Sequence, residues 1–360
     1  MKICLIGQNL TNFILALAFA EKKVSVDIHI NKKTNNFKTD RTIAISEKNF
    51  DYLNGLVKKP IPSWQSKEIK IYIEKTRSKE IINFKNNNRE VFNLVKFDKL
   101  VNLFATKIKK SKFIQLNKLD KLSQDYIHKV KNYDLVINSD SNNIISKKHF
   151  NNKIKKNYKS FAYTFIAYHK KKNNNIASQI FTKYGPLAFL PISNNQTSIV
   201  FSCSGRPRST EEILKLFNHY NSFYKIFKTG KIEKFNLNFF VTRNYIFKNI
   251  LAFGDLIHRI HPLAGQGFNM TIRDIKSLSN IIDKKINLGL PIDISVADEF
   301  QQSTKHLNYL YGKAIDGIYE FFKIDNQFNN FLSKPIFKIL NNNSSFKKYS
   351  SILSENGFNL

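Results

Sequence analysis

The stretch of sequence that decides the fold lies at residues 250–282 and reads ILAFGDLIHRIHPLAGQGFNMTIRDIKSLSNII. It begins with an apolar strand over residues 250–253 and continues through Gly254 and Asp255 at the carboxyl end of that strand. In open α/β sheets, ligands bind at the carboxyl ends of the strands. A carboxylate there can accept hydrogen bonds from the hydroxyls of a sugar-like ligand, so we expect a ligand site beside Asp255.

The second half of the stretch predicts a helix whose first turn faces a ligand. Pro262 is followed by Gly265, Gln266 and Gly267, and apolar residues then recur at helical spacing up to residue 281. The two glycines allow the backbone to approach a planar ligand closely. The start of a helix also presents unpaired N–H groups and a positive dipole potential to an electron-rich edge. This pattern suits an anionic, reduced ring system.

The N-terminal residues predict a strand, a turn, a helix and a second strand. The apolar run at residues 2–6 ends at Gly7, helical spacing follows over residues 13–18, and a strand pattern resumes over residues 24–30. This is a βαβ unit with a glycine at its first turn, where a dinucleotide-binding fold holds a pyrophosphate. A turn glycine after a strand is common, so Gly7 alone is a weak signal.

The rest of the chain alternates between two patterns. Residues 159–203 are rich in strand-forming segments, a helix is expected over residues 210–228, strands return up to residue 253, and the tail predicts helices. A hydrophobic fraction of 42% over 360 residues is enough for a packed core. We therefore predict two interleaved modules, one parallel α/β and one antiparallel.

The chain is strongly basic, with 58 Lys and Arg against 27 Asp and Glu and a formal net charge of +31. Lys, Asn and Ile are common in every region rather than gathered in one arm. We attribute most of the charge to compositional drift, and contact with an anionic membrane surface is a secondary use of it. Nucleic acid is not an expected partner, because the sequence has no zinc-finger spacing, aromatic RNP signature or basic-region heptad.

The cysteines and the N-terminus bear on the compartment. Cys4 and Cys203 form no disulfide framework and have no metal-ligand spacing, which favours a reducing compartment. No apolar run approaches the ~20 residues of a membrane span. The N-terminus imitates a signal peptide, but polar residues divide its apolar segment and a second strand follows directly. We expect a cytoplasmic protein, with peripheral contact at the inner face of the cytoplasmic membrane as the alternative.

Over residues 250–282 the sequence resembles the FAD-dependent aromatic hydroxylases of the para-hydroxybenzoate hydroxylase fold. More narrowly, it resembles the ubiquinone-biosynthesis hydroxylase family, which includes 2-polyprenyl-6-methoxyphenol hydroxylase. The family's Gly-Asp motif, Pro, Gly-Gln-Gly and Asn all occur here in order, the last as Asn269. Segments at residues 40–56, 184–202 and 310–322 also match, in the family's order. The resemblance therefore spans most of the chain.

The resemblance implies which residues hold the cofactor, FAD. Asp255 would bind the ribityl chain, Pro262 would flank the isoalloxazine, and Arg41 would lie near the cofactor. The backbone around Gly265 and Gly267 would line the pyrimidine edge. The full set of implied cofactor-binding residues is Gly7, Asn9, Asn12, Arg41, Asp140, Gly254, Asp255, Gly265, Gly267, Phe268 and Asn269. The residues implied around the reacting flavin ring are Pro262, Gly265, Gln266 and Gly267, and no metal site is implied.

The departures from the family pattern fall on the pyrophosphate side. The family's Gly-x-Gly-x-x-Gly motif begins at Gly7, but Asn9 and Asn12 occupy its later glycine positions. The second glycine lets a pyrophosphate approach the backbone, and the third lets the helix pack closely on the strand. The family's internal Asp-Gly appears here as Asp140-Ser141.

An acid is expected about 20 residues beyond the glycine motif, and none is clear. Asp27 comes early in the second strand, and Asn31 occupies the likelier position. His258 and His261 lie three apart beside the Gly-Asp motif, but no third ligand is suitably spaced for a metal. The Phe-rich stretch at residues 216–240 is expected to be core, although a polyprenyl tail would need such an apolar lining.

The resemblance implies a fold and a function. The fold is α/β, with a Rossmann-like FAD-binding domain, an inserted antiparallel β-sheet substrate domain and C-terminal helices. The expected domains are residues 1–65, 91–152 and 245–290 for FAD, residues 66–90 and 153–244 for substrate, and residues 291–360 for the helical region. The implied activity is hydroxylation of the ring of a polyprenylated phenol in ubiquinone biosynthesis, with NAD(P)H as reductant, O₂, and a flavin C4a-hydroperoxide. The alternative is a catalytically degenerate relative that serves the ubiquinone-synthesis assembly as a structural or lipid-binding member.

Overall fold

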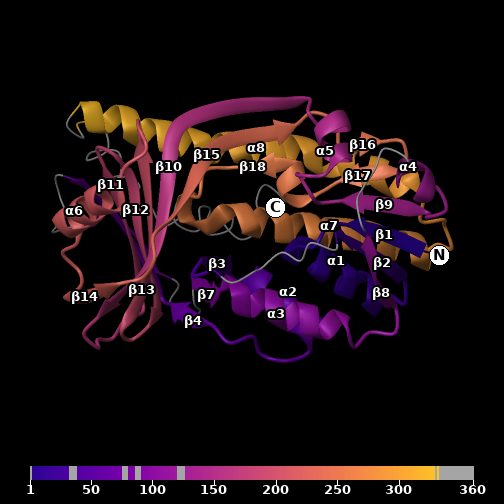
Figure 1. Ribbon diagram of the computed structural model, residues 1–360, viewed down its shortest axis with the longest axis horizontal. Coiled ribbons are helices and arrows are strands. Elements are labelled where there is room, and N and C mark those ends of the chain that lie inside the picture. Colours follow the sequence, from indigo (N-terminus) through magenta and orange to yellow (C-terminus); the bar gives the residue numbers. More distant parts are fainter. Residues whose placement is uncertain are drawn as a thin grey trace.

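The computed structural model describes residues 2–31, 39–74, 80–85, 91–119, 126–328 and 331. It combines a parallel sheet covered by helices with a large antiparallel sheet (Figure 1). The mixed α/β class expected from the sequence is confirmed. The two parts lie side by side, and helices of the C-terminal third run between and along them.

A six-stranded sheet forms the first part. Four of its strand pairs are parallel, and only the edge pair of β16 and β17 is antiparallel. Its central strands are almost entirely buried apolar residues, as expected for a sheet covered on both faces. In spatial order the strands are β16 (Ile246–Phe247), β17 (Ile250–Ala252), β9 (Leu135–Asn138), β1 (Lys2–Ile6), β2 (Ser25–Asn31) and β8 (Ile114–Leu119).

Helices cover this sheet, with α1 (Leu10–Glu21) at their centre. Helix α1 is buried on nearly all sides, because it packs against the sheet and against three other helices. Those helices are α2 (Glu47–Val57), α3 (Phe97–Ile108) and α7 (Gln266–Asn287). The βαβ unit of β1, α1 and β2 therefore forms as the N-terminal sequence predicts, and the short helices α4 (Tyr126–Lys129) and α5 (Ile144–His149) flank β9.

The second part is a nine-stranded sheet, antiparallel except where β11 pairs with β5. Its longest strand, β10, curves from this sheet towards the first part (Figure 1). Helix α6 (Thr210–Tyr220) packs on one face through aromatic contacts such as Phe165 with Phe217. The strands are β18 (His258–Arg259), β15 (Glu233–Thr242), β10 (Lys153–His169), β13 (Gln196–Ser204), β12 (Gly185–Ser193), β11 (Ile176–Thr182), β5 (Glu68–Ile73) and β6 (Ile82–Lys85), with β14 (Ile226–Thr229) paired to β10.

A small third sheet of β3 (Thr42–Ser46), β7 (Phe92–Lys96) and β4 (Trp64–Ser66) lies beside α2 and α3. Helix α8 (Ile294–Gln327) contacts strands of both large sheets, namely β16 of the first and β11, β15 and β18 of the second. Helix α8 thus ties the two parts together.

Among the described residues, no helix is both long and apolar enough to cross a membrane.

Two sequence expectations need correction at their boundaries. The helix expected over residues 210–228 ends at Tyr220, and the chain then forms strand β14. The apolar strand expected over residues 250–253 is β17 over Ile250–Ala252, and the next residue, Phe253, still donates its amide to the Asn138 carbonyl of β9 at 2.9 Å. The division into three domains stays a prediction, and its residues 1, 32–38, 75–79, 86–90, 120–125, 329–330 and 332–360 lie outside the described residues.

Candidate cofactor and active site

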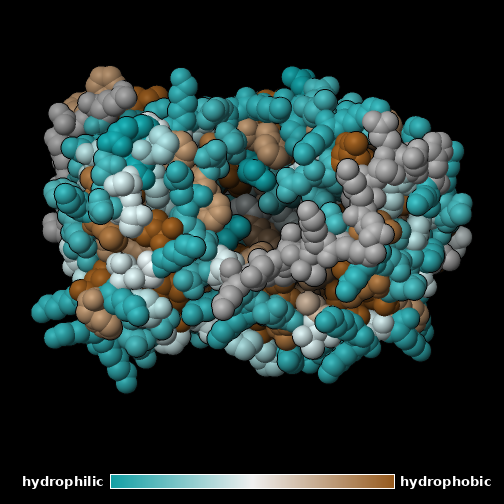
Figure 2. Space-filling model, in the orientation of Figure 1, coloured by the Kyte–Doolittle hydropathy of each residue, from teal (hydrophilic) through white to brown (hydrophobic). Residues whose placement is uncertain are grey.

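A cavity of about 1520 Å³ lies between the two large sheets. Figure 2 shows the hollow at the centre of the molecule. The cavity exceeds the ~300–1,000 Å³ typical of sites for drug-sized ligands, so it has room for a dinucleotide and a second molecule. We call it the central cavity. Nine residues implied by the family resemblance line it: Gly7, Asn9, Arg41, Asp140, Asp255, Pro262, Gly265, Gly267 and Phe268. Four others, Asn12, Gly254, Gln266 and Asn269, lie behind its wall.

Gly7 forms the turn between β1 and α1, with φ at +117°, a conformation that favours glycine. A Cβ added there would lie 2.8 Å from the Cβ of Asp140. The Gly7 amide donates to the carbonyl of His29, 3.0 Å away. Gly7 therefore joins the ends of β1 and β2 to the loop after β9, where the family's internal Asp-Gly was expected to lie.

Asn9 and Asn12, which replace two motif glycines, hold this turn with their side chains. Asn9 is the N-cap of α1: its Oδ1 accepts from the Asn12 amide at 3.0 Å, and its Nδ2 donates to Ser139 Oγ at 2.8 Å. The Asn12 side chain is fully buried and donates through Nδ2 to the Gly7 carbonyl at 2.8 Å. Of the two, only Asn9 borders the cavity. Asn12 instead fills the space between helix and turn that a glycine would leave open.

The acid of the second strand does not face the cavity. Asp27 is buried, accepts from Tyr133 Oη at 2.5 Å and forms an ion pair with Lys2 at 2.8 Å. His29 hydrogen-bonds with Tyr126 and Tyr133, and its burial lowers its pKa. In place of Asp27, His29 and Asn31 of β2 line the cavity. The end of this strand therefore offers a ligand uncharged groups only.

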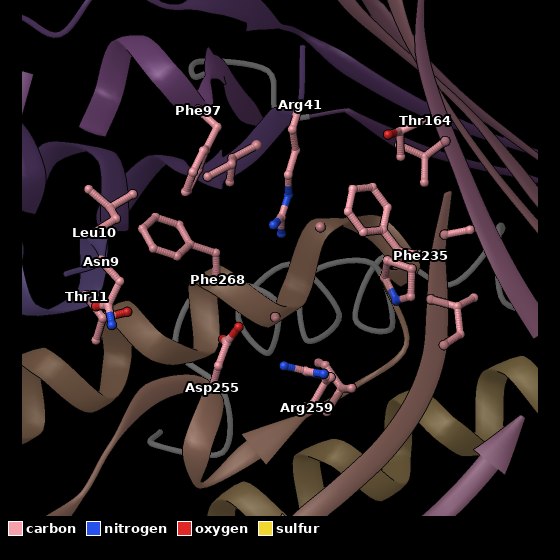
Figure 3. Close-up of a pocket in the computed structure, with 18 of the residues that line it drawn as sticks. Asn9, Leu10, Thr11, Arg41, Phe97, Thr164, Phe235, Asp255, Arg259 and Phe268 are labelled. Atoms are coloured by element: carbon pink, nitrogen blue, oxygen red, sulfur yellow. The ribbon is translucent and has the colours of Figure 1, made fainter. Parts of the chain in front are cut away.

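Asp255 projects into the cavity at the carboxyl end of β17, within the 3-10 helix η2 (Gly254–Leu256) (Figure 3). The preceding Gly254 has φ at +59°, and a Cβ there would lie 3.1 Å from the Thr11 side chain at the start of α1. This close approach aligns Asp255 with the first turn of α1. Among the described residues no ion pair involves the Asp255 carboxylate, which leaves it open to the hydroxyls of a ligand.

The first turn of α7 faces the same cavity. Its N-cap, Gly265, has φ at +67° and offers no capping side chain to the free N–H groups. A Cβ on Gly265 would lie 3.0 Å from the Cβ of Ala44. Asn269 fixes this approach, because its Nδ2 donates to the Ala44 carbonyl at 2.9 Å and its Oδ1 accepts from the Ser46 amide at 2.9 Å. Asn269 therefore acts as a clamp between α7 and β3.

Gln266, expected near the flavin ring, turns away from the cavity. Its side chain is buried, and its Oε1 accepts from Tyr311 Oη of α8 at 2.6 Å. The same helix α8 reaches the second half of the motif: Asp274 hydrogen-bonds with His258 Nε2 at 2.6 Å and accepts from Asn308 at 3.0 Å. His258 lines the cavity. The buried hydrogen bonds from Asn308 to Asp274 and between Asp274 and His258 therefore fix the orientation of the imidazole ring at the cavity wall.

His261 is also buried, stacked on Tyr319 with ring centroids 4.2 Å apart, and neither of its ring nitrogens has a hydrogen-bond partner in the described structure. Burial lowers its pKa to about 3. His258 and His261 thus do not act as a pair. No group of three or more His, Cys, Asp or Glu side chains suited to a metal is found in the part of the chain that the structure describes.

The far wall of the cavity is the inner face of the nine-stranded sheet. Successive residues along its strands alternate between large side chains under α6 and small ones towards the cavity, such as Phe165 next to Thr164 and Phe189 next to Ala188. The small cavity-facing residues are Ala162, Thr164, Ala177, Ser178, Ala188, Ser198 and Val200. Phe235, in the stretch expected to be core, is exposed and lines the cavity as well (Figure 3).

Several lining residues had no motif to mark them. Phe97 lies beside Arg41 in Figure 3, and the Arg41 guanidinium lies 5.5 Å from the Phe97 ring centre. The period-2 alternation of small and large residues was a signal for the sheet wall. No sequence signal indicated that Arg259 of β18 lines the cavity, because its position depends on the pairing of β18 with β15.

The ionisable residues of the lining favour an anionic ligand. Four of them are cations and two are carboxylates: Arg41, Lys147, Lys234, Arg259, Asp140 and Asp255. Two helix N-termini, those of α1 and α7, add positive potential. The glycine cradles at Gly7 and Gly265, the uncapped start of α7 and this charge balance fit FAD, with its anionic pyrophosphate and planar ring.

Comparisons with known proteins agree with this geometry. A family model described as FAD binding domain matches residues 176–287. The ubiquinone biosynthesis monooxygenase COQ6, mitochondrial, of Dictyostelium discoideum is 27% identical over 208 residues, which cover 47% of this chain and 42% of that protein. The 3-demethoxyubiquinol 3-hydroxylase of Escherichia coli K12 is 31% identical over 111 residues, covering 29% of this chain and 28% of that protein. The matches thus span less than half the length of these relatives.

Solved structures extend the similarity to almost the whole fold. The p-nitrophenol 4-monooxygenase PnpA of Pseudomonas putida DLL-E4 gives a TM-score of 0.81 at 10% identity, covering 99% of this chain and 98% of that one. PqsL of Pseudomonas aeruginosa, in complex with 2-aminobenzoylacetate, gives 0.70 at 13% identity over 90% of this chain and 96% of that one. At these identities the likeness concerns the fold. The resemblance expected from residues 250–282 is confirmed as similarity: parts of the chain are similar to ubiquinone-biosynthesis hydroxylases, and nearly the whole chain shares its fold with solved FAD-dependent monooxygenases.

Proposed function

We propose that the protein is an FAD-dependent monooxygenase that hydroxylates the aromatic ring of a polyprenylated phenol in ubiquinone biosynthesis. The observation that carries the proposal is a single cavity that joins the first turns of α1 and α7 and Asp255 to a sheet wall of small side chains. The names of the matched relatives support the substrate class. They give no support to the alternative of a non-catalytic member of the assembly.

In this proposal the chain's residues hold the cofactor in an extended pose. The first turn of α1, next to Gly7 and Asn9, binds the pyrophosphate through backbone N–H groups. Asp255 accepts hydrogen bonds from the ribityl hydroxyls. The backbone N–H groups at Gly267 and Phe268, in the uncapped first turn of α7, face the ring and stabilise negative charge on it. Reduced FAD supplies the oxygen-transfer chemistry with O₂.

The remaining residues position the substrate and exclude water. Pro262 and the start of α7 form one side of the reaction chamber, and the small residues of the sheet form the other. Because Ala162, Ala177 and Ala188 leave the chamber open, a substituted ring fits against the sheet, and Phe235 offers an apolar contact beside it. In this proposal the protein contributes to the reaction by holding the substrate ring near the flavin and by keeping water out of the chamber.

The finer assignments belong to the same proposal. NAD(P)H reduces the flavin, the protein acts in the cytoplasm, and its basic surface makes peripheral contact with anionic membrane, where a polyprenylated substrate resides. The proposed cofactor-binding residues are those given by the family resemblance, with Asn12, Gly254, Gln266 and Asn269 supporting the cavity wall rather than forming it.

The test is incorporation of oxygen into a polyprenyl phenol. FAD-loaded protein is incubated with NAD(P)H, ¹⁸O₂ and the phenol, and the product is analysed by mass spectrometry. We expect one ¹⁸O atom in the ring, and less product from the matched Asp255→Ala protein when FAD is below saturation. A protein that binds FAD but consumes NAD(P)H and O₂ without labelling any polyprenyl phenol would contradict the substrate assignment.

A further inference from the structure

Beside the central cavity, three cations lie next to one phenylalanine, and none of them has a counter-ion among the described residues. Lys155 of β10, Phe240 of β15 and Arg259 of β18 are directly opposite one another across three adjacent strands, so their side chains share one face. Lys153 lies two residues along β10 on the same face. We call Lys153, Lys155, Arg259 and Phe240 the basic row.

The cations are held close together. The Lys153 ammonium lies 3.8 Å from the centre of the Phe240 ring, and the Arg259 guanidinium lies 5.4 Å from it. Among the described residues, no ion pair is found for Lys153, Lys155 or Arg259. Burial, then the charges of Arg259 and Lys155, lower the pKa of Lys153 to about 8. Like charges at this spacing repel one another, and a bound anion would relieve that repulsion.

The basic row meets the cavity through Arg259 and is separate from the expected pyrophosphate site at α1. Arg259 lines the cavity, and in Figure 3 it lies on the opposite side of Asp255 from Asn9 and Thr11. A ligand at the basic row would therefore approach the cavity from the side of β15 and β18, while α1 holds the pyrophosphate of FAD.

We propose that the basic row binds the phosphate groups of a second nucleotide, the nicotinamide dinucleotide that serves as reductant. The inference rests on the proposed function and adds to it the place where the reductant docks. A pyrophosphate offers at least two charged groups for Lys153 and Arg259 to share, and Arg can bind phosphate with two parallel hydrogen bonds. The headgroup of an anionic phospholipid has the same chemistry, so the experiment must separate the two sources.

The test uses FAD-saturated protein and two redox-inert probes, inorganic pyrophosphate and NADP⁺, titrated by calorimetry. Lys153→Met removes the charge and keeps an apolar stem over Phe240, and Lys153→Arg restores the charge. The matched control is Lys228→Met, since Lys228 also lies over an aromatic ring of the same sheet, 5.7 Å from Tyr168, but belongs to β14 and not to the basic row.

We expect Lys153→Met and Arg259→Gln each to weaken both probes by roughly tenfold or more, and Lys153→Arg and Lys228→Met to match wild type. Equal affinity for the probes in Lys153→Met and wild type would overturn the proposal. So would unchanged probe binding together with a loss of sedimentation on phosphatidylserine-containing vesicles, since the row would then serve a lipid headgroup. If the protein binds no FAD, the same titrations on flavin-free protein still test the basic row, because the flavin result is read separately from absorbance.

Discussion

The side-chain amide of Asn12 donates a 2.8 Å hydrogen bond to the carbonyl of Gly7, from a position where the family motif has its third glycine. A buried asparagine thus closes the turn that glycine closes elsewhere by its small size. This explains how helix α1 can follow β1 despite the departure from the motif.

Replacing Asn12 by Ala should destabilise the protein. The change removes a fully buried hydrogen bond and leaves the Gly7 carbonyl without this donor, at a cost of about 1–3 kcal/mol in the free energy of unfolding. Denaturant unfolding measures it. The control is Asn102→Ala on the exposed face of α3, and equal midpoints for the two variants would show that the Asn12 bond does not support the turn.

Replacing Asn9 by Asp should leave folding intact but weaken FAD. Asp is as good an N-cap as Asn, but its charge would lie at the start of α1, where the proposal puts a pyrophosphate. We expect the FAD dissociation constant to rise roughly fivefold or more. Ser209→Asp at the N-cap of α6 controls for a charge added at a helix start outside the cavity lining. A dissociation constant that moves equally in both variants would argue against pyrophosphate at α1.

Asp255→Ala should weaken FAD binding by about 1–3 kcal/mol, the loss expected for hydrogen bonds to a charged group. Because the carboxylate is exposed to the cavity, its removal should cost the fold little. Fluorescence titration with FAD gives the affinity. Asp51→Asn, an exposed change on α2 outside the cavity lining, should leave it unchanged. Undiminished affinity in Asp255→Ala would remove this residue from the proposed site.

Gly265 and Gly289 have almost the same backbone conformation but different surroundings. Replacing each by Ala therefore distinguishes the cost of backbone strain from the cost of close packing. Gly265 and Gly289 have φ at +67° and +66°, but a Cβ on Gly265 would lie 3.0 Å from Ala44 whereas nothing lies within 4 Å of one on Gly289. Gly289→Ala should cost only the backbone strain, roughly 1–2 kcal/mol. Gly265→Ala should cost more and should also weaken FAD, since it pushes α7 from β3. Equal unfolding midpoints and equal FAD affinities in the two variants would contradict the close approach.

His261 should make the protein less stable in acid. Its pKa is about 3 in the folded state and near 6.5 when unfolded. Between these values the unfolded chain binds more protons, so stability is complete above about pH 6.5 and falls as the pH drops towards 3. His261→Phe, which keeps the ring on Tyr319, should reduce the slope in this window by up to about 1.4 kcal/mol per pH unit. His306→Phe, at an exposed position on α8, is the control. An unchanged slope in His261→Phe would mean that this histidine does not drive the acid sensitivity.

The sequence predicts the elements around the cavity better than the contacts that hold them. The period of apolar residues was enough for the βαβ unit and for the helix after Gly265, because both bury continuous apolar surface. The end of α6 was placed too late, because the apolar residues after Tyr220 pack as a loop and strand β14. Local patterning does not distinguish these outcomes.

The site depended on contacts between distant segments, which no spacing rule describes. The backbone at Asn269 was expected at the flavin, and the structure adds that the Asn269 side chain clamps Ala44 across 225 positions of sequence. Gln266 was expected near the ring, and its side chain accepts a hydrogen bond from Tyr311 of a helix that starts 28 residues later. Only the resemblance to a family could bring Arg41, Asp140 and Asp255 to one place before the strands were paired.

The central claim is that the protein binds FAD in the cavity between the two sheets, and the direct measurement is an absorbance and fluorescence titration of the purified protein with FAD. The account predicts saturable binding at one site per chain, with the flavin spectrum shifted from that of free FAD and the affinity reduced in Asp255→Ala. A protein that carries no flavin and gives no saturable change on titration would contradict the claim and leave only the fold standing.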